Sequence, residues 1–88
     1  MWKDVKDSAW SADHVARHGV VLDEVREAIL SRPYWMTSGK NDSTLIYGRT
    51  AAGRYLLVVV VNDGGEAFVV TARDMTAREK RTFGRKAR

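Results

Sequence analysis

The chain has 88 residues, of which 44% are hydrophobic and 30% charged, so it can bury one modest core and is expected to form a single domain over residues 1–88. It contains no cysteine, which excludes disulfides and thiolate metal centres, and its longest apolar run, Leu56 to Val61, is far shorter than the ~20 residues of a membrane span. The net charge of +4 is uneven, because residues 71–88 hold seven Lys/Arg against Asp74 and Glu79. Such a basic segment suits a polyanion or an acidic partner, or is simply a solvated helix face. The N-terminus carries no secretory signal pattern, so we expect a cytoplasmic protein.

Two short helices are predicted near the N-terminus. The first covers residues 11–19, with Ser11 as its N-cap and Gly19 free to take the left-handed conformation that ends many helices. The second has apolar residues at helical spacing, which predicts one core-facing side made of Leu22, Val25, Ala28 and Ile29. It should end at Arg32-Pro33, because proline disfavours helical geometry in the residue before it.

After the second helix the hydrophobic period changes from 3.6 to 2, which indicates strands. Three are predicted, separated by the hairpin signals Ala51-Ala52-Gly53 and Asp63-Gly64-Gly65: Thr44–Thr50, Arg54–Asn62 and Glu66–Arg73. The run Leu56–Val61 is apolar on both faces, so we expect a central strand covered on both sides. Residues 34–36 could add an edge strand.

A last helix is predicted from the capping-box pattern that begins at Thr76 and ends at Glu79. Phe83 is expected to anchor this helix on the sheet. Arg78, Arg81 and Arg85 lie at i, i+3 and i+7 and form one basic stripe. The fold class predicted is therefore α+β: two N-terminal helices, an antiparallel meander of three to four strands, and a basic C-terminal helix.

Several short segments in this order resemble the BrnT family of type II toxins, over most of residues 10–83. They are Trp10, the turn Arg17-His18-Gly19-Val20, Gly48-Arg49, the Leu56–Val61 strand, and Thr71-Ala72-Arg73 followed by Thr76 and by Arg78 to Arg81. The last segment is similar to the family pattern S-A-R-x-x-T-x-x-E-R. One departure is Val21, where the family commonly carries a Ser or Thr that caps the second helix, so about 1 kcal/mol of capping is missing. Trp10, matched in the family, is expected in the core.

The resemblance implies a RelE-like fold and a metal-independent endoribonuclease that inhibits bacterial growth, with no cofactor. It also implies RNA as substrate and a cognate small DNA-binding antitoxin as partner. A homodimer and a heterotetramer with the antitoxin are both compatible with the family.

Metal-free cleavage of RNA by its own 2′-hydroxyl needs a base, cations for the dianionic transition state and an acid for the leaving 5′-oxygen. Arg73 ends a strand just before a helix N-terminus, where guanidinium and backbone N–H groups could bind one phosphate. The alternative is a structural Arg paired with Asp74 or with a carboxylate of the second helix. Arg49 could meet Arg73 across the sheet if the strand register allows it. His18 is the candidate for acid–base work.

Five further residues are candidates for binding the substrate: Arg54, Tyr47, Arg78, Arg81 and Arg85. Arg49 is also compatible with a solvent-exposed role near the hairpin, and Arg54, at the other end of the same turn, is a weaker candidate by the same argument. Tyr47 is also compatible with a core role. His14 and His18 stand four residues apart, as two metal ligands would, but no third ligand has matching spacing, so no metal site is predicted.

The leading hypothesis is an endoribonuclease toxin with Arg73, Arg49 and His18 around the scissile phosphate. The alternative is a non-catalytic module whose basic helix and sheet face bind an antitoxin-like protein or nucleic acid. A structural or metabolic domain unrelated to toxins also stays open.

Overall fold

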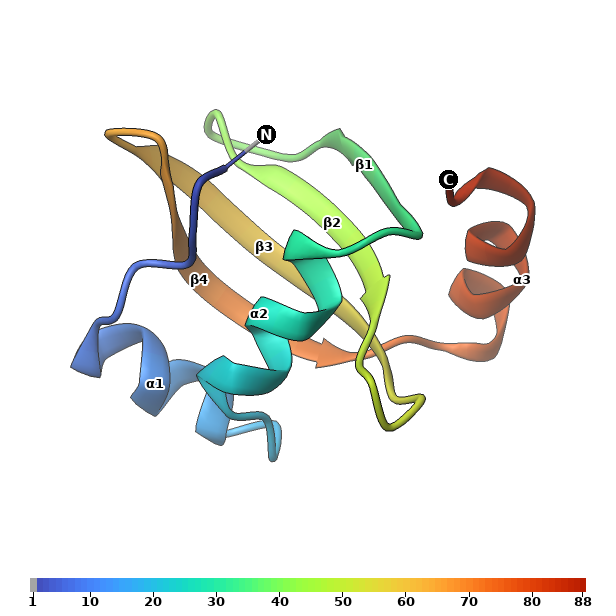
Figure 1. The fold of residues 1–88 in the computed structure, drawn as a ribbon, viewed down its shortest axis with the longest axis horizontal. Coiled ribbons are helices and arrows are strands. Elements are labelled where there is room, and N and C mark those ends of the chain that lie inside the picture. Colours follow the sequence, from blue (N-terminus) through green and yellow to red (C-terminus); the bar gives the residue numbers. More distant parts are fainter. Residues whose placement is uncertain (1) are drawn as a thin grey trace.

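The computed structural model describes residues 2–88 and contains a four-stranded antiparallel sheet with three helices (Figure 1). In chain order the elements are α1 (Ala9–Ala16), α2 (Leu22–Leu30), β1 (Tyr34–Ser38), β2 (Thr44–Arg49), β3 (Tyr55–Asp63), β4 (Glu66–Asp74) and α3 (Ala77–Lys86). The strands lie side by side in the order β1-β2-β3-β4, so each pairs with its neighbour in sequence. The predicted α+β class is confirmed. No helix in this part of the chain has the length and apolar character needed to cross a membrane.

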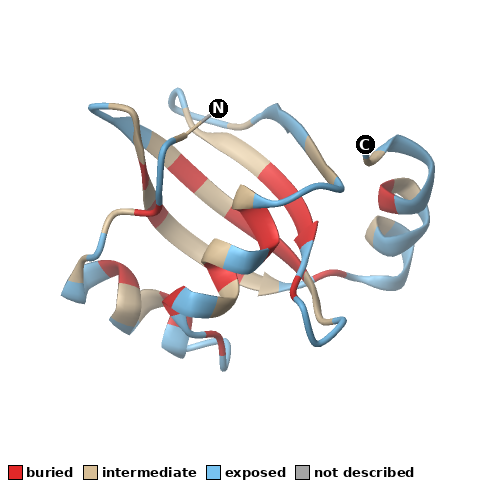
Figure 2. Cartoon of the chain, viewed as in Figure 1, coloured by how far each residue is buried: buried red, intermediate tan, exposed pale blue. Residues whose placement is uncertain are grey.

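Helices α1 and α2 cover one face of the sheet, while α3 lies against one end of the opposite face (Figure 1). Beneath α1 and α2 lies the main core, and Figure 2 shows its buried residues gathered on the inner strands and on the sheet-facing sides of these helices. The predicted apolar side of α2 is confirmed by the burial of all four of its residues. The end of α3 is tied to the edge strand, because Tyr34 and Arg88 exchange two backbone hydrogen bonds of 3.3 and 3.1 Å.

The start of α1 differs from the prediction, because Ser8 and not Ser11 is its N-cap. The Ser8 hydroxyl accepts a hydrogen bond from the Ser11 N–H at 3.3 Å. Ser11 itself is fully buried, and its hydroxyl donates to the Val69 carbonyl of β4 at 2.6 Å, next to a β-bulge. A cap must face the open end of its helix, whereas this hydroxyl is used to satisfy a strand carbonyl in the core.

The turn between α1 and α2 follows the sequence-based expectations. Gly19 has a φ of +69°, and the Val20 N–H donates to the Val15 carbonyl at 3.1 Å, which closes the end of α1. Val21 is the N-cap of α2 and offers no side-chain acceptor. Glu24 partly compensates, because its carboxylate accepts the Val21 N–H at 3.1 Å.

Strand β3 is an inner strand as predicted, but the expected cover on both faces is wrong for half of its length. Leu56, Val58 and Val60 face α1 and α2 and are fully buried. On the other face Leu57 is buried with Phe83 of α3, whereas Val59 and Val61 are only half-buried. The reason is the length of α3, which has 10 residues and reaches only one end of the sheet.

Strand β2 and helix α2 approach each other closely at Gly48. A Cβ atom built on Gly48 would overlap the backbone carbonyl oxygen of Ala28 and lie 2.7 Å from its carbonyl carbon. Because the obstacle is helix backbone and not a flexible side chain, it has no way to move aside locally. Glycine is therefore required at this crossing for α2 to lie on the sheet.

We predict that Gly48→Ala lowers the free energy of unfolding by about 3 kcal/mol, since it forces α2 away from β2. Chemical denaturation followed by circular dichroism measures this change. Gly84→Ala is the matched control: it lies in α3 with nothing within 4 Å of the added Cβ, so it should stabilise the protein by about 0.5–1 kcal/mol. Equal stability of the two variants would contradict the close contact.

Candidate functional site

The candidate site lies on the open face, which we define as the sheet face opposite α1 and α2. Tyr47 of β2 pairs with Leu57 of β3, and Leu57 pairs with Arg73 of β4, so these side chains emerge in one row on that face. Arg49 pairs with Tyr55 and lies on the same face. The register therefore gives Arg49 and Arg73 a common face, which the sequence left undecided.

Arg73 forms a two-pronged ion pair with Glu79 of α3. Its Nη1 and Nη2 donate to the two carboxylate oxygens of Glu79 at 2.8 and 3.0 Å, and Nη1 also donates to the Asp74 carbonyl at 3.0 Å. These hydrogen bonds, together with the N–H and hydroxyl of Thr76, hold the pKa of Glu79 below its ordinary value despite its partial burial. The carboxylate stays ionised and fixes the guanidinium at the junction of β4 and α3.

Glu79 was not recognised as a site residue from the sequence. It was predicted only as the last residue of the capping box, a role that it also fills, because it accepts the Thr76 N–H at 2.8 Å. For a structural Arg73, the sequence predicts Asp74 or a carboxylate of α2 as the partner. The partner is instead the capping glutamate, so the capping pattern directly after Arg73 was the available signal.

Tyr47 is a buried aromatic residue beside this ion pair. Its ring stacks on Trp35 with centroids 4.6 Å apart, and the residue is 8% exposed. Burial raises the pKa of the phenol, and the charge of Glu79 raises it further, while Arg73 opposes the shift. The phenol is therefore neutral over the physiological range and carries a proton that it can donate.

Arg49 lies farther along the open face, on the other side of Tyr55 from β4. Its guanidinium is 5.8 Å from the centre of the Tyr55 ring, and the Lys80 ammonium is 5.4 Å from the same ring. Both cations line a cleft of about 350 Å³ between α3 and the sheet, together with Pro33, Tyr55, Phe83, Gly84 and Ala87. Arg49 pairs with Tyr55 of β3 and Arg73 pairs with Leu57, so the two arginines lie on either side of β3 and are offset by two residues along it.

Arg54 has its whole guanidinium engaged within the protein. Nε and Nη2 donate to the Asp74 carboxylate at 2.7 and 3.2 Å, Nη1 donates to the Gly19 carbonyl at 2.8 Å and to Glu24 at 3.2 Å, and Nη2 reaches the His18 carbonyl at 3.4 Å. All five N–H donors of an arginine are thus accounted for. The pKa of Asp74 is lowered by the hydrogen bond from Arg54. This geometry favours a structural role for Arg54 over the predicted substrate-binding one.

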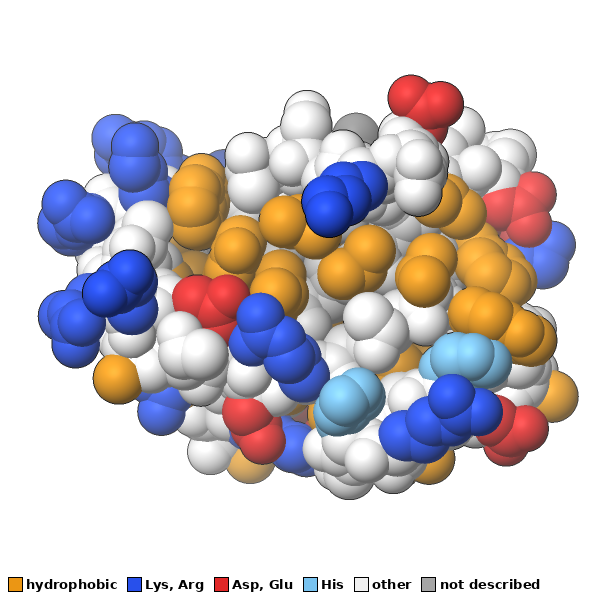
Figure 3. Space-filling view, turned by 180° about the vertical axis from the view of Figure 1, so that it is seen from behind, with side chains coloured by type: hydrophobic (Ala, Val, Ile, Leu, Met, Phe, Trp, Pro, Cys, Tyr) orange, Lys and Arg blue, Asp and Glu red, His pale blue; other side chains and the backbone are white. Residues whose placement is uncertain are grey.

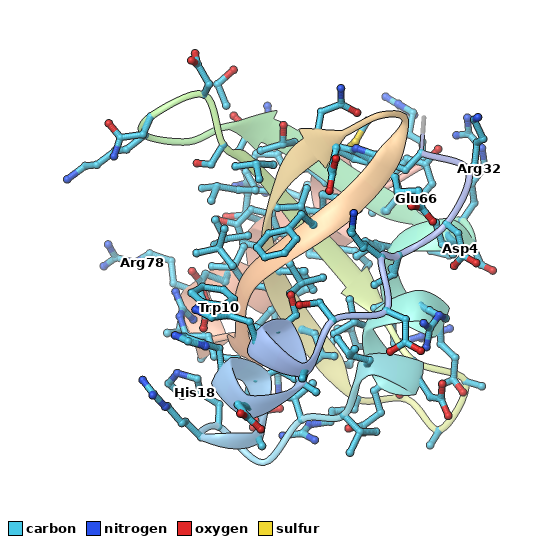
Figure 4. The ribbon with its side chains drawn as sticks, turned by 90° about the vertical axis from the view of Figure 1, so that its left-hand side faces the viewer. Asp4, Trp10, His18, Arg32, Glu66 and Arg78 are labelled. Carbon is cyan, nitrogen blue, oxygen red and sulfur yellow. The ribbon has the colours of Figure 1, made fainter. Side chains whose placement is uncertain are left out.

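His18 is exposed in the turn after α1, and only its backbone carbonyl is used by Arg54. Figure 4 shows His18 and Arg78 on the same side of the molecule, one from the α1 turn and the other from the start of α3. Within residues 2–88, no hydrogen bond connects the His18 side chain to Arg73. Of the three residues expected around one phosphate, Arg73 and Arg49 share the open face, whereas His18 comes from the turn after α1.

The basic stripe predicted on α3 is present. Arg78, Arg81 and Arg85 are exposed, whereas Phe83 is 5% exposed and meets the Tyr55 ring edge-on at 5.8 Å. Figure 3 shows an apolar band across the open face, with Lys and Arg side chains concentrated at the end that α3 occupies. The expectation that Trp10 lies in the core is wrong, because it is 47% exposed.

Metal-ligating residues do not converge in the described part of the chain, where no group of three or more His, Asp or Glu side chains is placed to hold an ion. No protein-family model, curated protein or solved structure matches this chain.

We predict that the Arg73–Glu79 pair stabilises the protein at neutral pH and loses its effect in acid. Because the folded pKa of Glu79 lies below the ordinary 4.5, its contribution is complete above that value and is lost as the pH falls through the lower, folded pKa. Glu79→Gln should lower the free energy of unfolding by about 1 kcal/mol near neutral pH and by progressively less below about pH 4.5. Urea denaturation across this pH range measures the difference.

Asp13→Asn removes one negative charge from an exposed position of α1 and serves as the control. The free energy of unfolding of Asp13→Asn should stay close to that of the wild type at every pH. A cost for Glu79→Gln that does not change with pH would contradict the ionic character of the pair.

Proposed function

We propose that this chain is a RelE-like endoribonuclease toxin that cleaves RNA without a metal ion. The observation that carries the proposal is the state of Arg73, a guanidinium held rigidly by Glu79 on an otherwise open sheet face. Its side chain is 41% exposed, so the fixed cation also faces solvent. A rigid cation aimed at the place where charge develops is the usual means of stabilising a phosphoryl transition state.

The donors of Arg73 support contact with a phosphate. Nη1 uses both of its N–H groups on Glu79 and Asp74, and Nη2 uses one on Glu79. The Nε–H and the second Nη2–H have no partner among residues 2–88. These two donors point side by side in a guanidinium and match two oxygens of one phosphate. Arg54, with all five donors used, lacks this capacity.

Proton transfer is assigned to neighbouring groups in this proposal. Tyr47 supplies the acid, because its neutral phenol lies beside the Arg73–Glu79 pair and can protonate the leaving 5′-oxygen. His18 is the candidate base for the 2′-hydroxyl and approaches from the α1 turn. Arg49 and Lys80 add positive charge farther along the strand, where the RNA backbone continues.

The remaining parts of the proposal concern partners and setting. RNA is the substrate, and Arg78, Arg81 and Arg85 hold its backbone. A cognate antitoxin with an acidic segment would neutralise the same stripe by charge complementarity. Both the RNA substrate and the antitoxin would be encountered in the cytoplasm.

A non-catalytic module that binds an antitoxin-like protein or nucleic acid is the second candidate. It is favoured by one observation: within residues 2–88, no hydrogen bond joins the His18 side chain to Arg73, and Arg54 uses only the His18 carbonyl. Retained RNA binding without cleavage would select it.

We predict that Arg73→Ala reduces RNA cleavage in excess EDTA by about 100-fold or more, because it removes the cation that faces the scissile phosphate. The assay follows a defined single-stranded RNA on a denaturing gel. The melting temperature should fall by only a few degrees, since the lost ion pair is partly exposed.

Arg26→Ala is the matched control for this assay. Arg26 is an α2 arginine on the far side of the sheet, paired with Asp23 at 3.0 Å and Asp4 at 3.4 Å. The Arg26→Ala variant should cleave the RNA at the wild-type rate. Equal activity of Arg73→Ala and the wild type would remove Arg73 from the chemistry.

We predict that replacing Arg78, Arg81 and Arg85 with Gln weakens RNA binding mainly at low salt. Each lost phosphate contact should reduce the slope of log affinity against log salt by about 0.7, so the triple variant should lose about 2 from the slope. Fluorescence anisotropy with a labelled oligonucleotide measures it.

The control replaces Lys3, Arg26 and Lys40 with Gln, which changes the net charge equally but leaves α3 intact. It should lower the slope much less. Identical slopes for the two variants would mean that overall charge, and not the α3 stripe, attracts the RNA.

A further inference from the structure

A large aromatic surface lies outside the site described above, on the outer side of α1. Trp10 is 47% exposed, yet its ring is fixed. It stacks on the His14 ring with centroids 3.6 Å apart and an interplanar angle of 22°, and the Phe68 ring of β4 lies 5.5 Å away. The backbone carbonyl of Trp10 also lies 2.8 Å from His14 Nδ1, which holds the imidazole in place. Trp10 and His14 form what we call the α1 platform.

The platform continues toward the turn after α1. Arg17 and His18 follow Trp10 at i+7 and i+8, so they lie on the side of α1 that carries Trp10 and His14. Figure 4 shows Trp10, His18 and Arg78 on the side of the molecule away from Asp4 and Glu66, and Figure 1 shows that α1 and α3 lie at opposite ends of the sheet. Figure 3 shows both histidines on the same face as the apolar band, away from the Lys and Arg side chains at the α3 end.

The turn after α1 is connected to the Arg73 site through Arg54. The Arg54 guanidinium binds the His18 carbonyl and the Asp74 carboxylate at once, and Asp74 is the residue next to Arg73. The distance between the α1 platform and Arg73 is therefore held by a rigid link and not by a free loop.

The chemistry of the platform favours a nucleobase over an apolar protein segment. Flat rings that are already stacked offer a π surface at little cost in side-chain entropy, and every base has a π face to match. Arg17, two helical turns from Trp10, is placed for a phosphate that adjoins such a base. The platform borders the apolar band of the open face through Phe68, whose cross-strand partner is Val61, so the stacked rings and the neighbouring Arg17 are what distinguish it from a purely aliphatic surface.

We infer that the α1 platform is a stacking subsite for an unpaired base of the RNA strand whose phosphate contacts Arg73. This inference rests on the proposed function, since it specifies how the same RNA is held. A base must be free of its stack to reach Trp10, so single-stranded RNA is preferred over a duplex with little dependence on sequence.

The test measures the affinity of a uniformly 2′-O-methylated RNA oligonucleotide, which binds but lacks the attacking 2′-hydroxyl. Trp10→Ala should weaken binding by about 5- to 100-fold, the range for loss of one stacked base, while Trp10→Phe keeps most of the affinity. Met36→Ala, which removes a 41% exposed apolar side chain on β1, is the matched control and should bind as the wild type does.

A second measurement locates the base. Oligonucleotides with a single abasic position, moved along the strand, should lose affinity for the wild type at one position, and that loss should disappear in Trp10→Ala. Melting temperatures of the Trp10 variants check that they fold, and Trp10→Phe keeps the test valid if the Ala variant is unstable.

The outcomes separate the two proposals. Wild-type affinity in Trp10→Ala together with a uniform abasic series overturns the stacking subsite, whatever the cleavage assay gives. A lack of cleavage by the wild type, with the Trp10 effect intact, overturns the ribonuclease and leaves the stacking subsite standing.

Discussion

The arrangement of this molecule depends on the need to bury both faces of β3 with only three short helices. Helices α1 and α2, of 8 and 9 residues, both lie on one face and complete the main core there. Only α3 remains for the other face, and its single buried residue, Phe83, closes one end. The rest of that face stays open. Arg73 and Arg49 therefore reach solvent near the ends of β4 and β2, with the buried Tyr47 beside them, on rigid strands that suit a functional site.

Two arginines of the same small region have different roles because their donors are used differently. Arg54 donates to the α1 turn, α2 and the end of β4, and nothing in its guanidinium is left for a ligand. Arg73 gives only part of its donors to Glu79 and Asp74. Each holds the pKa of one neighbouring carboxyl group low. Arg54, Asp74, Arg73 and Glu79 form a charged seam across the end of β4. In this seam Arg54 holds the α1 turn and α2 against β4, whereas Arg73 faces solvent.

The surfaces around this seam combine the groups that a single nucleic-acid strand requires. The α3 stripe carries positive charge, the open face carries partly covered apolar and aromatic side chains, and the α1 platform offers stacked rings. Affinity for phosphates and stacking of bases are separate contributions, so they can be removed one at a time. In the proposed ribonuclease, the RNA strand would therefore run from the α1 platform past Arg73 of β4 to the α3 stripe.

The sequence by itself determined the elements, because hydrophobic period, turn residues and the Thr76–Glu79 capping box are local signals. It predicted both N-terminal helices, the strand meander and the basic α3 stripe, and it singled out Arg73. Only the tertiary structure decided which donors are free. The Arg73–Glu79 pair joins successive elements, and its sequence signal is the capping box that follows Arg73. The closed shell around Arg54, the burial of Ser11 and the exposure of Trp10 have no such signal. They arise where segments far apart in the chain pack together, and no local pattern encodes those contacts.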